Sequence, residues 1–262
     1  MKKYDVRLCK ISTKTEIAPG FFDIRVEAGG LAEQAQPGQF AQIKVPGAAL
    51  RRPISICEID RAEGRLRFVF QIRGEGTRAL AQIPQGEALD ILAPLGTGFP
   101  LLEAGQKALL IGGGIGTPPL LPLAQHYGAN SVAALGFRDA SSVILREDFA
   151  AAGAEVRIAT DDGSAGRHGL VTQAVGDLTP DVLYACGPLP MLKAVARLAD
   201  ARQIPCYVSL EERMACGVGA CLGCVCTLLD EKGRPYQGSV CKNGPVFDYR
   251  RVAGLRGEER HG

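Results

Sequence analysis

Five cysteines crowd into 26 residues near the end of the chain. Three of them, Cys216, Cys221 and Cys224, have the CxxxxCxxC spacing of a loop that wraps a 2Fe-2S cluster, and a fourth, more distant cysteine completes four thiolates for two irons. Cys226 and Cys241 are the candidates for that fourth position. The glycines between these cysteines let backbone amides approach the sulfurs. The spacing therefore predicts a one-electron redox centre.

A structural zinc site is the alternative, in a non-redox interaction module. Zinc held by four cysteines usually sits between two CxxC pairs on separate knuckles. Here the CxxC at 221–224 has no second pair downstream, and three of the cysteines share one loop. This arrangement favours the cluster over zinc. The nine cysteines in all, without a secretion signal before them, favour a metal site over disulfides.

A glycine-rich turn in LLIGGGIGTPPLLPL, residues 109–123, is a candidate dinucleotide site. An apolar strand runs into glycines and then into a helix beginning near Pro118, and a helix N-terminus favours a pyrophosphate. The residues predicted to bind there are Gly112, Gly114, Gly116 and Thr117. The fit to GxGxxG is imperfect because Thr117 replaces the third glycine. A tight turn without a ligand is the alternative.

Two further segments carry flavin-type chemistry, RRPISI at 51–56 and VFQIRGEGT at 69–77. A guanidinium such as that of Arg52 binds phosphate bidentately, and Ser55 can hydrogen-bond the edge of a ring. Gly76 and Thr77 offer donors for a second phosphate contact. A charged strand edge followed by an ordinary turn is the alternative interpretation.

The segment DVLYACGPLPML, residues 181–192, places Cys186 and Gly187 at the end of a predicted strand. Strand ends face the ligand crevice in an open α/β sheet, so Cys186 is expected beside a nicotinamide unless it is simply a small buried thiol. Further upstream, Asp139 suits a ribose hydroxyl and Arg138 a 2′-phosphate, which leaves NAD and NADP both open. The three histidines lie far apart, and no base for proton abstraction stands out.

Two kinds of element must position these residues. Short β-branched or aromatic segments between Tyr4 and about Leu92 predict an antiparallel barrel, and from about Leu109 apolar strands alternate with helices, which predicts a doubly wound parallel sheet. A cluster of Pro and Gly at 94–105 marks the boundary. We therefore expect a barrel domain at 1–100, an α/β domain at 101–208, and a small cysteine-rich module with its tail at 209–262.

Composition excludes several classes of protein. A net charge of +2 and a pI near 8.1 are too mild for a nucleic-acid binder. The first ten residues lack the apolar core of a signal peptide, and the most apolar stretch, 108–124, is too broken by glycine and proline to span a membrane. We expect a cytoplasmic protein with no membrane segment, and disorder in the arginine-rich tail RRVAGLRGEERHG.

The order of RRPIS, GEGT, GGGIGTPPL, CGPLPML, CGVGACLGCVC and VCKNGPVF resembles the ferredoxin-reductase superfamily over residues 4–249. More narrowly, it is similar to the electron transfer subunits of NAD-dependent dihydroorotate dehydrogenases. The resemblance implies FAD contacts and four cluster ligands at the residues Arg52, Pro53, Ile54, Ser55, Val69, Phe70, Gln71, Gly76, Thr77, Cys216, Cys221, Cys224 and Cys241. Ile54 stands where many relatives have a flavin-stacking tyrosine.

The resemblance also implies a redox relay. Electrons would pass from the FMN of a dihydroorotate dehydrogenase catalytic subunit, through the 2Fe-2S cluster and FAD, to NAD+, in a heterotetramer of two copies of each chain. Because hydride chemistry moves two electrons and the cluster moves one, a flavin is needed to convert between them. The alternative is a ferredoxin:NAD(P) reductase or a sulfide dehydrogenase subunit, relatives in which the first cluster cysteine is often aspartate.

Overall fold

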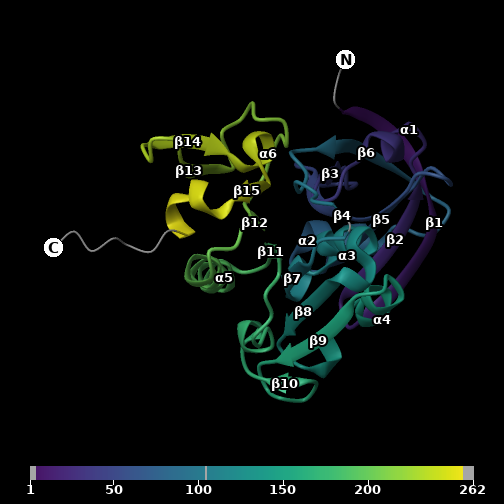
Figure 1. The fold of residues 1–262 in the computed structure, drawn as a ribbon. Coiled ribbons are helices and arrows are strands. Elements are labelled where there is room, and N and C mark those ends of the chain that lie inside the picture. Colours follow the sequence, from purple (N-terminus) through teal and green to yellow (C-terminus); the bar gives the residue numbers. More distant parts are fainter. Residues whose placement is uncertain (1–3, 104, 256–262) are drawn as a thin grey trace.

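The computed structural model describes residues 4–103 and 105–255. Figure 1 shows a barrel and an α/β sheet side by side, with the C-terminal segment folded back beside both. The predicted fold class, a barrel followed by a doubly wound sheet and a cysteine-rich module, is confirmed.

The barrel closes in the strand order β1-β2-β5-β4-β3-β6, with every pair antiparallel. Its strands are β1 (Asp5–Ala18), β2 (Phe21–Glu27), β3 (Phe40–Ile43), β4 (Arg52–Asp60), β5 (Arg65–Gln71) and β6 (Ala88–Leu95), and its helices are α1 (Gly30–Gln34) and α2 (Glu75–Gln82). The first five strands overlap the β-branched or aromatic segments of the sequence at 4–11, 21–28, 39–45, 53–59 and 66–73, although β1 continues to Ala18. The sixth, β6, is an addition that closes the barrel by pairing with both β1 and β3.

The second sheet has the order β10-β9-β8-β7-β11-β12-β15 and is parallel except for β15. Its strands are β7 (Ala108–Gly113), β8 (Ser131–Phe137), β9 (Glu155–Thr160), β10 (Arg167–His168), β11 (Val182–Cys186), β12 (Cys206–Ser209) and β15 (Val246–Asp248). Along β7, Leu109 and Ile111 join one hydrophobic core, whereas Ala108 and Leu110 join another. Alternate side chains point to opposite faces, so the sheet is buried on both sides.

Helices cover both faces of this sheet: α3 (Leu121–Tyr127), α4 (Arg146–Ala151) and α5 (Leu189–Arg202). In α5 the buried side chains are Leu192, Val195, Ala196 and Ala199, which share one stripe at helical spacing. These four pack in the same core as Leu109 and Ile111, which fixes α5 against that face.

A buried ionic cluster joins the two sheets. Arg67 of β5 is 5% exposed and donates to both carboxylate oxygens of Asp23, at 2.7–3.0 Å, and to Glu58 at 3.2 Å. The same guanidinium pairs with Asp148 of α4. Because a buried charge is costly unless it is paired, this contact holds the α/β sheet against the barrel.

The C-terminal segment leaves the sheet after β12 and returns to it at β15. Between them lie the cysteine loop, a hairpin of β13 (Val225–Leu229) and β14 (Pro235–Ser239), and the short helix α6 (Val240–Asn243). Because β15 pairs with β12 in an antiparallel register, the cysteine loop is anchored at both ends on the edge of the α/β sheet.

The prediction of a disordered tail is wrong for residues 250–255. They form short 3-10 turns in which Val252 and Leu255 are buried against the main core, and the hydroxyl of Tyr249 just before them donates to Asp200 at 2.5 Å. Isolated apolar residues without periodicity gave no sign of this packing. The rest of the predicted tail, 256–262, lies outside the described residues. No helix in the described ranges is long and apolar enough to cross a bilayer.

Candidate functional site

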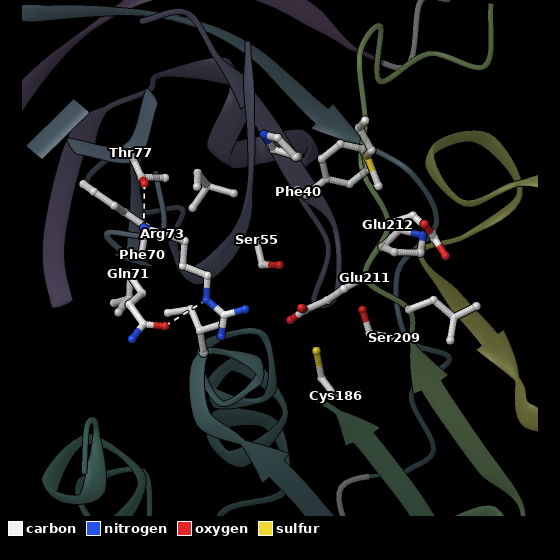
Figure 2. A pocket seen from close by; sticks show the side chains of 17 residues that line it. Phe40, Ser55, Phe70, Gln71, Arg73, Thr77, Cys186, Ser209, Glu211 and Glu212 are labelled. Carbon is white, nitrogen blue, oxygen red and sulfur yellow. Dashed lines mark hydrogen bonds between the residues drawn. The ribbon is translucent and has the colours of Figure 1, made fainter. Parts of the chain in front are cut away.

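A cavity of about 240 Å³ opens where the barrel meets the α/β sheet, and Figure 2 shows its walls. Three separate parts of the chain contribute. Its lining residues are Phe40, Pro53, Ile54, Ser55, Val69, Phe70, Gln71, Arg73, Thr77, Ile115, Cys186, Ser209, Leu210, Glu211, Glu212, Met214 and Pro245. Eight of the residues predicted to bind a cofactor are among these, seven from the barrel and Cys186 from the end of β11.

The two remaining flavin candidates, Arg52 and Gly76, meet beside the cavity. A Cβ on Gly76 would lie 1.9 Å from Nε of Arg52, so only glycine lets the guanidinium lie across the first turn of α2. Thr77 fixes that turn, because its hydroxyl accepts from the amide of Arg73 at 2.9 Å and donates to the carbonyl of Gly74 at 3.1 Å. A guanidinium beside a helix N-terminus is a fitting place for a phosphate.

The floor of the cavity is formed by Cys186, with Ser209 and Glu211 beside it and Ser55 facing them from the barrel (Figure 2). Burial raises the pKa of the Cys186 thiol, and the nearby carboxylate of Glu211 raises it further. The thiol therefore stays neutral at physiological pH. The neutral thiol and the hydroxyls of Ser55 and Ser209 offer polar contacts to the edge of a ring, with the carboxylate of Glu211 beside them.

A second cavity, of about 370 Å³, lies at the carboxyl ends of β7, β8 and β11. Its lining residues are Arg73, Gly113, Gly114, Gly136, Phe137, Arg138, Asp161, Gly169, Leu170, Val171, Thr172, Pro188, Pro190, Met191 and Ala194. Ligands of open α/β sheets bind at these strand ends. Arg73 lines both cavities, so they are neighbours that one flavin and one nicotinamide can share.

Of the four residues predicted to bind a dinucleotide at the glycine turn, Gly114 lines the second cavity, together with its neighbour Gly113. A Cβ on Gly116 would lie 2.4 Å from the carbonyl oxygen of Cys186, and one on Gly112 would lie 2.9 Å from Oγ1 of Thr117. Gly187 in turn lies against the backbone of Gly113. Gly112, Gly116 and Gly187 thus let the ends of β7 and β11 approach each other closely. They affect the shape of the cavity through this packing, without lining it.

Asp139, which was predicted to bind a ribose hydroxyl of the dinucleotide, is held by hydrogen bonds within its own turn. Asp139 accepts from the amide of Ser142 at 3.0 Å and from the hydroxyl of Ser141 at 2.6 Å, and it pairs with Arg138. The Ser141 and Arg138 hydrogen bonds lower the pKa of Asp139 to about 2. Its carboxylate is thus engaged in its own turn. Asp161, which the sequence gave no reason to single out, is the acid that lines the second cavity.

The cysteine loop surrounds its sulfurs with backbone donors. Sγ of Cys216 accepts from the amides of Val218 at 3.4 Å and Ala220 at 3.3 Å. Sγ of Cys241 accepts from Gly219 at 3.2 Å, Sγ of Cys221 from Gly223 at 3.4 Å, and Sγ of Cys224 from Cys241 at 3.4 Å. Amides aimed at all four sulfurs stabilise thiolates. The donor set therefore fits a cluster held by thiolate ligands.

The four sulfurs are arranged as two pairs. Cys216 hydrogen-bonds with Cys221, and Cys241 with Cys224. Among residues 4–103 and 105–255, no three Cys, His, Asp or Glu side chains converge closely enough to hold one metal ion. A 2Fe-2S cluster takes two thiolates on each iron, so two neighbouring pairs of cysteines suit its ligand set.

The pKa values of the Cys216 and Cys241 thiols are shifted in opposite directions. Burial opposes ionisation of Cys216, but hydrogen bonds from the Val218 amide and from Cys221 outweigh it and lower the pKa to about 6. Burial and the neighbouring Cys224 raise the pKa of Cys241 to about 12. Cys216 is thus better prepared than Cys241 to bind iron at neutral pH, since the thiolate is the ligand form.

Cys226, the other candidate for the fourth position, lies in β13, outside this set of hydrogen bonds. Its pKa is raised to about 11 by burial and by Glu212, and its side chain is half-buried beside Thr227 and Val252. Cys241, by contrast, shares hydrogen bonds with Cys224 and with the loop amide of Gly219. The geometry favours Cys241 as the fourth ligand.

Comparison with known proteins places this arrangement in a family. The iron-sulfur cluster binding domain of dihydroorotate dehydrogenase B matches residues 211–253. The dihydroorotate dehydrogenase B (NAD(+)) electron transfer subunit of Bacillus caldolyticus is 45% identical over 247 residues, which cover 90% of this chain and 94% of that one. The chain belongs to this family. The subunit of Geobacillus thermodenitrificans is 47% identical over 241 residues, covering 88% and 92%.

Solved structures agree with the family assignment. One is a chain of the NADH-dependent reduced ferredoxin-NADP oxidoreductase, a protein of flavin-based electron bifurcation. It has a TM-score of 0.82 at 28% identity, and the match covers 94% of this chain and 90% of that one. Phthalate dioxygenase reductase, at 17% identity, has a TM-score of 0.59 and covers 90% and 77%. The latter shows the fold alone.

Sequence reasoning missed one whole wall of the first cavity. The end of β12 and the segment after it supply Ser209, Leu210, Glu211, Glu212 and Met214, more than 130 residues from the barrel motifs. Phe40 and Arg73 were missed as well. Only Arg73 carried a local signal, because it directly precedes GEGT; the others lack any motif of their own.

Proposed function

We propose that the chain carries electrons between a partner subunit and NAD+, with a 2Fe-2S cluster held by Cys216, Cys221, Cys224 and Cys241 and an FAD in the first cavity. The family is that of an NAD-linked oxidoreductase component, and the chain uses FAD, a 2Fe-2S cluster and NAD. When bound, the cluster exchanges single electrons and the flavin exchanges one or two.

One observation carries this proposal: the cysteine loop and the first cavity share a single hydrophobic core. Phe40 lines the cavity and belongs to the same buried cluster as Cys224 and Cys241. Met214 lines the cavity and packs against that cluster, only two residues before Cys216. Two redox groups held in these places would both lie against this one hydrophobic core.

Different residues would bind FAD and NAD, in the first and the second cavity respectively. Arg52 and the first turn of α2 would bind phosphate, while Ser55, Cys186 and Ser209 would face the flavin ring. Gly114 and Met191 of the second cavity would admit the dinucleotide, with Arg73 between the two sites.

The partner is a catalytic subunit, as the name of the family implies. We further propose that it is an FMN-containing dihydroorotate dehydrogenase, that two copies of each chain assemble, and that the complex is cytoplasmic. Exposure supports an electron entry point at the loop: Cys221 is exposed, and Leu222 beside it is 70% exposed. We also propose that the chain divides into three domains, with boundaries after residues 100 and 208.

The test is reconstitution with the co-expressed catalytic subunit. We expect NAD+ reduction that depends on dihydroorotate, a complex with equal amounts of the two chains, and FMN in the partner. Dihydroorotate-independent reduction of NAD+ by the purified pair would contradict the proposed donor. A native mass other than two of each would contradict the stoichiometry and leave the electron path intact.

A further inference from the structure

Gln42 is a polar side chain buried at the junction between the flavin cavity and the cysteine loop. It lies in β3, two residues after Phe40, and its exposed fraction is 0%. Alternate residues of a strand point to the same side, so Gln42 and Phe40 share one face of β3. Phe40 lines the first cavity, and Gln42 continues that face toward the cysteine loop.

The Gln42 side chain meets the cysteine loop at Ala215 and Gly217, the two neighbours of Cys216. Its Nε2 donates to the carbonyl oxygen of Ala215 at 3.5 Å. A Cβ on Gly217 would lie 2.6 Å from Cγ of Gln42 and 3.0 Å from Nε2, and Gly217 has a φ of +72°. The glycine is thus pressed against the amide in a conformation that favours glycine. A barrel residue supports the loop on both sides of its first cysteine.

Packing alone does not account for a glutamine in this place. Within the described part of the chain, Oε1 of Gln42 is fully buried without a hydrogen-bond partner. An unpaired buried amide oxygen is unfavourable, and methionine would fill a similar volume without that penalty. The hydrogen bond from this amide to the cysteine loop is therefore the best explanation for a glutamine at this position.

We propose that Gln42 is a positioning residue for the cluster loop, which seats residues 215–217 on the flavin barrel. One strand then lines the flavin cavity and fixes the Cys216 side of the cluster. The inference rests on the proposed function, because it requires a cluster on the four cysteines. Dipoles and hydrogen bonds near the sulfurs tune the reduction potential of such a cluster, so a barrel residue contributes to it.

The experiment compares Gln42→Met and Gln42→Glu in the full chain, purified anaerobically, with Lys44→Met as the matched control. Lys44 lies two residues further along the chain, just past the end of β3, and it is exposed. Iron and FAD content, the EPR spectrum after dithionite reduction, the midpoint potential and the rate of iron loss to a chelator are measured. These readouts do not depend on turnover.

We expect Gln42→Met to bind FAD and iron, to lose iron about three- to tenfold faster, as for one net hydrogen bond, and to show a changed EPR line shape and a shifted potential. Gln42→Glu should make the potential more negative, because a nearby carboxylate disfavours an added electron. Lys44→Met should match the wild type in every readout.

Unchanged EPR spectra and potentials in the Gln42 variants would overturn the proposal, even if iron retention fell, because the residue would then only fill space. If Gln42→Met does not fold, the potential of Gln42→Glu decides in the same way. A wild-type protein without a 2Fe-2S signal would instead refute the proposed function, before any variant is compared.

Discussion

Gly76→Ala separates flavin binding from folding. The new Cβ would lie 1.9 Å from Nε and 2.3 Å from Nη2 of Arg52, so the guanidinium must leave its place. Those atoms are the far end of a flexible side chain, which can move aside without a shift of the backbone that carries it. Gly76 lies inside α2, where alanine is favoured over glycine by about 0.5–1 kcal/mol.

The predicted effect is a loss of flavin affinity in a protein that is at least as stable. A hydrogen bond to a charged group contributes about 1.5–3 kcal/mol, so displacing Arg52 from an FAD phosphate should weaken binding about ten- to one-hundred-fold. Titration of the deflavinated chain with FAD measures the affinity, and thermal unfolding of the same chain measures stability. Arg52→Ala should cause a similar loss, and the double variant should lose little more, because the two changes remove one interaction.

Gly74→Ala is the matched control, since a Cβ there meets nothing within 4 Å. It should leave FAD affinity close to that of the wild type. The reasoning is refuted if Gly76→Ala binds FAD as tightly as the wild type, or if the flavin-free variant unfolds at a clearly lower temperature.

Three further predictions concern the cluster and the junction between the sheets. Cys221→Ser should lose the iron-sulfur EPR signal and keep FAD, whereas an unaltered signal would reject the ligand assignment. Cys226→Ser should keep both cofactors by the same measurements, and loss of iron would make it a ligand. Asp23→Asn should lower the free energy of unfolding by about 1.5–3 kcal/mol, because Asp23 accepts three hydrogen bonds from the buried guanidinium of Arg67. Asp148→Asn should cost less, because Asp148 accepts one such bond and its side chain is more exposed, at 31% against 15% for Asp23. Equal losses in denaturant unfolding of the two variants would contradict that ranking.

Local patterns were enough to predict much of the fold. Five barrel strands, the glycine turn and helix α5 each have a continuous signature in the sequence. Periodicity placed α5 at 189–202, because its buried residues recur at helical spacing. The sixth barrel strand, β6, was missed although it alternates regularly, and so were the short strands of the C-terminal segment.

The site was predicted less completely, because its walls come from distant parts of the chain. Ser55 and Cys186 have motifs around them, but Glu211 and Met214 reach the cavity only because β15 returns to pair with β12 and anchors the segment between them. Gln42 has no motif, and only the fold shows that it lies under Gly217. Contacts of this kind depend on tertiary packing, which no local pattern records.

An anaerobic titration of the purified chain with NADH, followed by absorbance and EPR together, shows whether electrons pass from NADH through the flavin to the cluster. We expect NADH to bleach the flavin and then to produce a 2Fe-2S signal in the wild type, and Cys221→Ser to show flavin bleaching alone. A wild-type chain whose flavin is reduced without any iron-sulfur signal, or one that holds stoichiometric zinc and no flavin, would contradict this electron path.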